Sequence, residues 1–305
     1  MRLSSAVAHL SHAVRTCTRI ATEPRFAGRR GSLLATYLRV RGRRLLRVRH
    51  RDGDAHAVAG FHVASFDCFS LDYLFDEIFV GLEYHFETAS DAPVIVDCGS
   101  NIGMSVLFFK WLHPRARIVA FEPGERAFSL LQENVRRNRL ADVTVHNRPV
   151  GDDEGTIVFH VDPGDPGSFM MSAFESRMPK ATREVQMVRL STLIDGPVDF
   201  LKLDVEGAEL DVLRDLQRSG RLRLISQMVI EYHHHLAEDH DRLSELLAIL
   251  ESSGFGYQVA SPGSHARERG AFQDLLLWVY RKEGAAVIGL AGDGRAGVRE
   301  VSPAA

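Results

Sequence analysis

Residues 97–103 and Glu122 combine residue types that suit a nucleotide-like ligand. Residues 97–103 read Asp-Cys-Gly-Ser-Asn-Ile-Gly and stand between a short apolar run and a segment of helical spacing. Glycines in such a turn let the backbone approach a ligand, and the start of a helix offers free N–H groups. Glu122 lies nineteen residues beyond Gly103, at the end of the next apolar run. A carboxylate at that place can accept hydrogen bonds from both hydroxyls of a ribose.

The glycine spacing separates two classes of nucleotide-binding protein. A nicotinamide-dependent oxidoreductase needs G-x-G-x-x-G after the first strand to seat a pyrophosphate, and Asn101 stands where the middle glycine would be. The carboxylate of Asp97 would repel a pyrophosphate but attract the ammonium and sulfonium groups of S-adenosylmethionine. The turn therefore favours S-adenosylmethionine. An oxidoreductase and a protein that binds S-adenosylmethionine without catalysis stay open as alternatives.

A second group of polar residues follows two later apolar runs. Lys202, Asp204 and Glu206 alternate, so they face one side of an extended chain, and Glu231 and His233 do the same. Because buried charges are usually paired, Lys202 is also expected to neutralise Asp204 or Glu206. Asp204, Glu206 and His233 offer oxygen and nitrogen donors, so a metal site is an open alternative. We predict none.

The spacing of apolar residues predicts the elements that position these groups. Short apolar runs alternate with segments of helical spacing, which indicates a parallel sheet covered by helices on both faces. Strands are expected at 94–97, 118–121, 143–147, 156–161, 185–190, 199–203, 226–231, 256–259 and 275–280. Helices are expected at 71–87, 104–112, 125–139, 208–218 and 239–252. Ahead of these, an amphipathic helix and a strand pair, 37–50 and 55–64 around a turn at 51–54, are expected.

Composition and charge restrict the class of protein further. The chain has 305 residues, of which 45% are hydrophobic and 25% charged, and a formal net charge of -3. This composition is typical of a globular protein, and no apolar run reaches the roughly 18 residues that a membrane-spanning helix requires. Residues 1–51 carry thirteen arginines and one acid. They form a basic arm without the sustained apolar region of a signal peptide, although a transit peptide would look similar.

The three cysteines indicate the compartment. Cys17, Cys68 and Cys98 form neither a CxxC pair nor an even-numbered set. Neither a zinc site nor structural disulfides are therefore predicted, and a reducing, cytoplasmic location is expected.

Four motifs together resemble the FkbM-type methyltransferases. They are residues 97–103, Phe121-Glu122-Pro123, 151–155 (Gly-Asp-Asp-Glu-Gly) and 199–209 (Asp-Phe-Leu-Lys-Leu-Asp-Val-Glu-Gly-Ala-Glu). The similarity runs from about Tyr84 to Tyr280. Cys98 and Ser100 stand where such proteins usually show Val or Ile and Ala, changes that keep side-chain size. The resemblance implies an S-adenosylmethionine-dependent O-methyltransferase of the class I, Rossmann-like fold, with a mostly parallel seven-stranded sheet.

The resemblance also implies where ligands bind. It places the methionine end of S-adenosylmethionine against the turn, the ribose on Glu122 and the adenine near Asp152. The turn residues expected to contact the cofactor are Asp97, Gly99, Asn101 and Gly103. The implied acceptor is a hydroxyl of a small molecule such as a sugar or polyketide, and no nucleic acid is expected as a partner.

Three regions are expected along the chain. Residues 1–83 would form a basic extension that covers the substrate side, 84–282 the methyltransferase domain and 283–305 a disordered tail. Residues 162–183, rich in proline, glycine and methionine, are expected to form a mobile loop that closes over the acceptor.

Methyl transfer restricts which residues can catalyse. The step is an in-line displacement, and the acceptor hydroxyl must lose its proton to a nearby base. His233 is the predicted base, because the reference pKa of histidine near 6.5 leaves neutral imidazole at pH 7. Glu231 shares its face and would orient the ring or the acceptor. Asp204 is the alternative base.

Overall fold

The computed structural model describes residues 2–161, 181–235, 242–261, 273–282 and 297–298. The chain divides into two compact units. One comprises Met1–His85 together with Glu133–Arg139, and the other comprises Phe86–Gln132 together with Leu140–Ala305. The main division lies two residues beyond the boundary expected after residue 83.

The N-terminal unit is built from helices and one hairpin. Its helices are α1 (Arg2–Thr22), η1 (Pro24–Phe26), α2 (Arg30–Leu45), α3 (Cys68–Leu74) and the π-helix η2 (Phe75–Val80). The hairpin joins β1 (Ala55–Val58) to β2 (Phe61–Ala64). No helix in the described part of the chain is long and apolar enough to cross a membrane.

The strand expected at 37–50 is wrong. Alternation of arginine with apolar residues from Tyr37 onward resembles a strand pattern, but these residues continue helix α2 to Leu45. The buried side chains of α2 are Leu33, Thr36, Tyr37 and Val40, which follow helical spacing. The hairpin turn consequently lies at Ala59 and Gly60 rather than at 51–54, and both turn residues have positive φ, as a two-residue type I′ turn requires.

The second unit contains a seven-stranded sheet in the order β11-β12-β10-β9-β3-β4-β5. β12 is antiparallel to its two neighbours, and the other pairs are parallel. The strands are β3 (Val94–Cys98), β4 (Arg117–Phe121), β5 (Val143–His146), β9 (Val198–Leu203), β10 (Ile225–His234), β11 (Phe255–Ala260) and β12 (Gln273–Arg281). This sheet confirms the predicted fold class.

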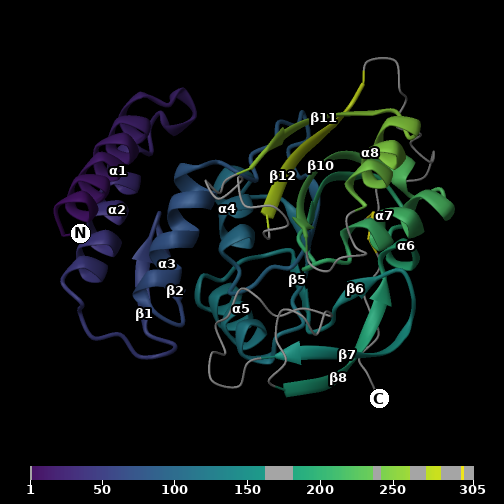
Figure 1. The fold of residues 1–305 in the computed structure, drawn as a ribbon, viewed down its shortest axis with the longest axis horizontal. Coiled ribbons are helices and arrows are strands. Elements are labelled where there is room, and N and C mark those ends of the chain that lie inside the picture. The colour runs from purple at the N-terminus through teal and green to yellow at the C-terminus, as the bar shows by residue number, and fades with distance from the viewer. Residues whose placement is uncertain (1, 162–180, 236–241, 262–272, 283–296, 299–305) are drawn as a thin grey trace. The chain divides into compact units, whose positions relative to one another are not determined.

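Helices cover both faces of this sheet. α4 (Met104–Leu112) and α5 (Glu125–Arg137) lie on one side, and α6 (Leu190–Leu193), α7 (Glu209–Arg218) and α8 (Leu243–Ser252) lie on the other (Figure 1). A short helix, η3 (Leu222–Leu224), precedes β10. Right-handed crossovers account for the two faces, because the chain moves outward from β3 to β5 and in the opposite direction from β9 to β10.

The strand order reverses between β3 and β9. These neighbours run parallel, yet β3 leads to β4 on one side while β9 leads to β10 on the other. In open sheets of this kind, ligands bind beyond the carboxyl ends of the strands at such a switch point. The turn at 97–103, Glu122 and Asp204 all follow strands that end here.

A smaller sheet and a packed segment complete the second unit. β6 (Val150–Gly151), β7 (Gly155–Val161) and β8 (Ala181–Arg189) form the order β6-β8-β7. Of the predicted loop 162–183, residues 162–180 lie outside the described residues. Within the expected tail, Val298 is buried and bridges Ile194, so this part of 283–305 is packed against the domain.

Candidate active site

The turn after β3 depends on glycine because it passes close to the end of β9. Gly99 and Gly103 have φ of 85° and 87°, a region that side chains rarely adopt. A Cβ on Gly99 would lie 1.9 Å from the carbonyl oxygen of Asp204. A Cβ on Gly103 would lie 2.7 Å from Leu131 Cδ1. Glycine at these two positions therefore lets the backbone of the turn pack against Asp204 and Leu131.

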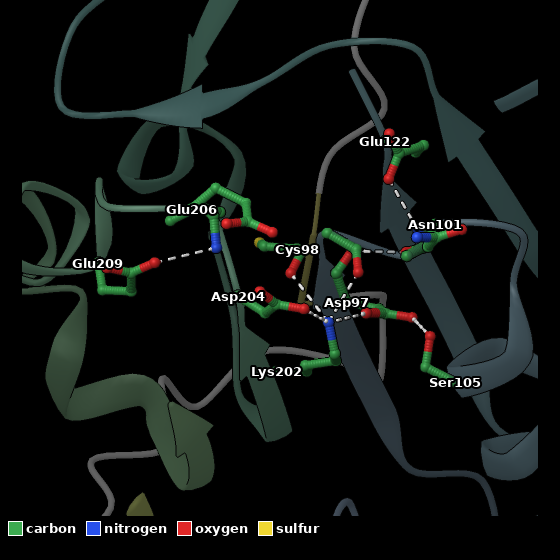
Figure 2. Close-up of polar contacts among 12 residues, drawn as sticks. Asp97, Cys98, Asn101, Ser105, Glu122, Lys202, Asp204, Glu206 and Glu209 are labelled. Atoms are coloured by element: carbon green, nitrogen blue, oxygen red, sulfur yellow. Dashed lines mark hydrogen bonds and ion pairs between the residues drawn. The ribbon is translucent and has the colours of Figure 1, made fainter. Parts of the chain in front are cut away.

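Asp97 lies beneath this turn, fully buried. Its Oδ2 accepts a hydrogen bond from Ser105 Oγ at 2.5 Å (Figure 2). Its Oδ1 lies 3.8 Å from Lys202 Nζ and accepts no hydrogen bond within the described part of the chain. Burial raises the pKa of Asp97, against the opposing effects of Lys202 and Ser105. Oδ1 is thus the atom that remains able to accept a hydrogen bond from a ligand.

Lys202 links the turn to the end of β9. Its Nζ donates to Gly99 O at 2.7 Å and to Asp204 Oδ2 at 2.9 Å (Figure 2). Burial alone would lower the pKa of Lys202, but the carboxylates of Asp204 and Asp97 raise it overall. The side chain therefore stays charged. The expected pairing of Lys202 with Asp204 is present.

Glu122 closes the other side of the turn. Its Oε2 accepts from Asn101 N at 2.8 Å and its Oε1 accepts from Gly124 N at 2.7 Å. The residue is buried, and burial raises its pKa to about 7 although these two N–H groups lower it. An ionised carboxylate offers about four acceptor sites. Both oxygens therefore keep capacity for a further donor.

Asp152 is placed differently from the other predicted cofactor residues. Its Oδ2 lies 3.4 Å from Arg218 Nη2, and its side chain is 41% exposed. Arg218 is the last residue of α7, so this contact connects Asp152 to that helix rather than to the turn at 97–103.

His233 is surrounded by carboxylates. Its Nδ1 lies 2.9 Å from Glu209 Oε1, and its Nε2 lies 3.2 Å from Glu206 Oε2. Asp204 Oδ1 and Asp274 Oδ1 are each 3.9 Å from Nε2. Burial alone would lower the pKa of His233, but Glu209 and then Glu206 and Asp204 raise it to about 10. This raised pKa favours the protonated imidazole at pH 7, whereas the sequence predicts a neutral ring that acts as the base.

The carboxylates near His233 differ in exposure. Asp204 and Glu206 side chains are each 21% exposed, whereas the His233 side chain is 3% exposed. Glu231 lies on the same strand, and burial together with Asp204 raises its pKa well above the ordinary value. Asp204 and Glu206 are therefore the more accessible carboxylates, while burial and the charge of Asp204 favour the neutral form of Glu231.

Sequence reasoning missed Glu209. This fully buried carboxylate accepts from Gly207 N at 2.9 Å and from Val205 N at 3.2 Å, besides contacting His233. It stabilises the turn between β9 and α7, in which Glu206 and Gly207 have φ of 56° and 111°. Glu209 belongs to the 199–209 motif, but the sequence does not show that its side chain contacts His233 on β10.

The donor groups near His233 could also hold a cation. The ligand atoms of Asp204, Glu206 and His233 lie within 4.8 Å of one another, as do those of Glu231, His233 and Asp274. Contact of Nδ1 with Glu209 fixes the ring so that Nε2 faces the carboxylates. Binding a cation there would require His233 Nε2 to lose the proton that its raised pKa favours.

Comparison with known proteins agrees with the motifs. A family model for the methyltransferase FkbM domain matches residues 97–259. Methyltransferase 1 of Beauveria bassiana is 31% identical over 213 residues, which cover 63% of this chain and 84% of that protein. The 31-O-demethyl-FK506 methyltransferase FkbM of Streptomyces tacrolimicus is 28% identical over 234 residues, covering 64% and 86%. The 2-O-methyltransferase NoeI of Sinorhizobium fredii is 33% identical over 145 residues, covering 40% and 56%.

A solved structure gives a weaker likeness. The FkbM methyltransferase from Methylobacillus flagellatus has a TM-score of 0.43 and 19% identity. The match covers 70% of this chain and 54% of that one. Because the family model spans more than half of the chain, this chain belongs to the FkbM methyltransferase family.

Proposed function

We propose that this protein transfers the methyl group of S-adenosylmethionine to a hydroxyl oxygen of a small molecule. The observation that carries the proposal is the meeting of the turn at 97–103, Glu122 and Asp204 at the carboxyl ends of β3, β4 and β9. Lys202 links the first of these to the last by hydrogen bonds to Gly99 and Asp204.

The residues present suit this cofactor. Asp97 Oδ1 is a buried acceptor without a hydrogen bond among the described residues, and Glu122 keeps acceptor capacity on both oxygens. The first suits the ammonium of the methionine end, and the second suits the two ribose hydroxyls. Gly99, Asn101 and Gly103 offer backbone groups to the cofactor, and the two glycines have no side chain that would obstruct it. Asp152 is proposed for the adenine end. The cofactor supplies an electrophilic methyl group.

The names of two relatives favour oxygen as the methyl acceptor. NoeI is a 2-O-methyltransferase, and FkbM of Streptomyces tacrolimicus is a 31-O-demethyl-FK506 methyltransferase. Transfer to oxygen forms a C–O bond as the C–S bond breaks, leaving S-adenosylhomocysteine and one proton to be removed. The proton must go to a group at the acceptor side of the site.

We assign that proton to Asp204. Its carboxylate is partly exposed, whereas the raised pKa of His233 favours an imidazole that already carries a proton at pH 7. In this assignment Lys202 fixes one oxygen of Asp204, and the other, Oδ1, faces the His233 side and receives the proton. His233, whose ring nitrogens lie 2.9 Å from Glu209 and 3.2 Å from Glu206, would position the carboxylates beside Asp204, and Glu231 lies on the same strand as His233. This assignment replaces the neutral-imidazole base expected from the sequence.

The proposal is tested by methyl transfer from labelled S-adenosylmethionine to a panel of hydroxylated acceptors, with products identified by mass spectrometry. A methyl ether on at least one acceptor supports it. Binding of the cofactor without transfer to any acceptor would favour a non-catalytic binding protein. Acceptor-dependent oxidation of a reduced nicotinamide would favour an oxidoreductase.

A further inference from the structure

Three metal-binding side chains converge within the N-terminal unit. His50 follows α2, His56 lies on β1, and Cys68 is the first residue of α3. His56 Nε2 lies 2.9 Å from His50 Nδ1, and Cys68 Sγ lies 3.4 Å from the same nitrogen. The three atoms are all within 4.8 Å of one another, so side chains from three separate segments meet at one point.

A backbone contact fixes the orientation of His50. Its Nε2 lies 3.0 Å from the carbonyl oxygen of Ser65, which can only accept, so Nε2 carries a proton. In the neutral ring Nδ1 then has one lone pair, and this lone pair faces His56 and Cys68. A hydrogen bond from the second ring nitrogen to a carbonyl is the usual means by which proteins orient a metal-binding histidine.

Hydrogen bonding alone satisfies this cluster poorly. In the neutral cluster, both the His56 Nε2–H and the Cys68 S–H would donate to the single lone pair of His50 Nδ1. One lone pair accepts one good hydrogen bond, so one donor is left with a poor partner. A cation at the centre would instead receive a lone pair from each of the three atoms.

We propose that His50 Nδ1, His56 Nε2 and Cys68 Sγ bind one Zn²⁺ ion. The donor set of two imidazoles and one thiolate suits Zn²⁺ and does not suit Mg²⁺ or Ca²⁺, which take oxygen ligands. The thiol gives up its proton to solvent on binding. The proposal is independent of methyl transfer.

The two distances from His50 Nδ1 are close to those of such a site. With Zn–N of about 2.0 Å and Zn–S of about 2.3 Å, tetrahedral ligand nitrogens lie about 3.3 Å apart, and nitrogen and sulfur about 3.5 Å apart. The distances here are 2.9 Å between the nitrogens and 3.4 Å from His50 Nδ1 to sulfur. Movements of a few tenths of an ångström would bring both distances to these values, and His56 Nε2 and Cys68 Sγ lie within 4.8 Å of each other. The ion would connect α2, β1 and α3.

Cobalt spectroscopy on the full chain tests the proposal. Co²⁺ replaces Zn²⁺ in such sites, and its bond to a thiolate gives an intense near-ultraviolet charge-transfer absorption that oxygen and nitrogen ligands do not give. The chain is treated with a chelator, kept reduced and titrated with Co²⁺. We expect this absorption to saturate at one equivalent and to disappear when Zn²⁺ is added.

Two cysteine variants form a matched pair. Cys68→Ser should abolish the charge-transfer absorption, whereas Cys17→Ser should keep it, because Cys17 lies in α1 outside the cluster. His56→Asn should weaken Zn²⁺ binding by more than the roughly 10- to 100-fold that loss of an outer partner causes. Wild-type protein that binds Co²⁺ without this absorption, or binds none, would overturn the proposal whether or not the variants fold. The same absorption in Cys68→Ser would also overturn it.

Discussion

The protonation of His233 decides how the candidate active site can work. Four carboxylates lie within 3.9 Å of its ring nitrogens, and three of them, Glu209, Glu206 and Asp204, raise its pKa to about 10 despite burial. A protonated ring donates hydrogen bonds and stabilises negative charge, but it does not take a proton from an alcohol. The residue type was predictable from the sequence, whereas its charge depends on carboxylates from other elements.

The raised pKa of His233 predicts a pH dependence of stability. Its folded-state pKa of about 10 exceeds the unfolded value near 6.5, so its contribution is fully present below pH 6.5 and is lost as pH rises through 10. Between these values this group should lower the free energy of unfolding by at most about 1.4 kcal/mol per pH unit. Urea unfolding across this range should show that fall in wild type and in His62→Gln, an exposed control, but not in His233→Gln.

Glu122→Ala should weaken cofactor binding. Loss of the carboxylate leaves ribose hydroxyls without acceptors in a buried site, which we expect to cost about 2 to 3 kcal/mol of affinity for S-adenosylhomocysteine. Glu125→Ala, which removes an exposed carboxylate three residues later, should leave affinity unchanged. Calorimetric titration measures both. Unchanged affinity in folded Glu122→Ala would remove the ribose assignment.

Gly99→Ala should destabilise the second unit. Its positive φ and the 1.9 Å approach of a Cβ to Asp204 O force the turn away from β9. Thermal unfolding should shift downward, and cofactor affinity should fall with it. Gly42→Ala is the control, because Gly42 lies in α2 with nothing within 4 Å of an added Cβ and alanine favours helix by about 1 kcal/mol. Equal melting temperatures for the two variants would contradict the close approach.

At the scale of elements, the sequence predicted the second unit better than the first. Buried parallel strands bounded by turn residues gave strong signals, and β3, β4, β5 and β9 lie within one or two residues of their predicted positions. In the N-terminal unit, the alternation of Leu38 and Val40 with Arg39 and Arg41 resembled the pattern of a strand. The helix instead buries Leu33, Tyr37 and Val40 along one face, a pattern that only a longer window reveals.

Two adjacent leucines test the orientation of α2. Leu33 is fully buried and Leu34 is 37% exposed. Leu33→Ala should therefore lower the free energy of unfolding by about 2 to 5 kcal/mol, while Leu34→Ala should change it by less than about 1 kcal/mol. Chemical denaturation followed by circular dichroism measures both. Equal losses would show that the helix face is wrongly assigned.

Across the whole molecule, contacts within one motif could be predicted from the sequence, whereas contacts between distant segments could not. The family motifs sufficed for the fold class and for the turn beside Glu122, because each motif is local. The convergence of Glu209 on His233 joins residues 24 positions apart. The proposed zinc ligands have no CxxC pattern and come from the loop after α2 (His50), from β1 (His56) and from α3 (Cys68). Such contacts depend on tertiary packing, which spacing rules do not encode.

We propose that the edge formed by β3, β4 and β9 binds S-adenosylmethionine. Calorimetric titration of the full chain with S-adenosylhomocysteine tests it most directly, because it needs no knowledge of the methyl acceptor. We predict saturable binding of one ligand per chain, displaced by S-adenosylmethionine and unaffected by NAD. Absence of binding, or displacement by NAD instead, would contradict the account.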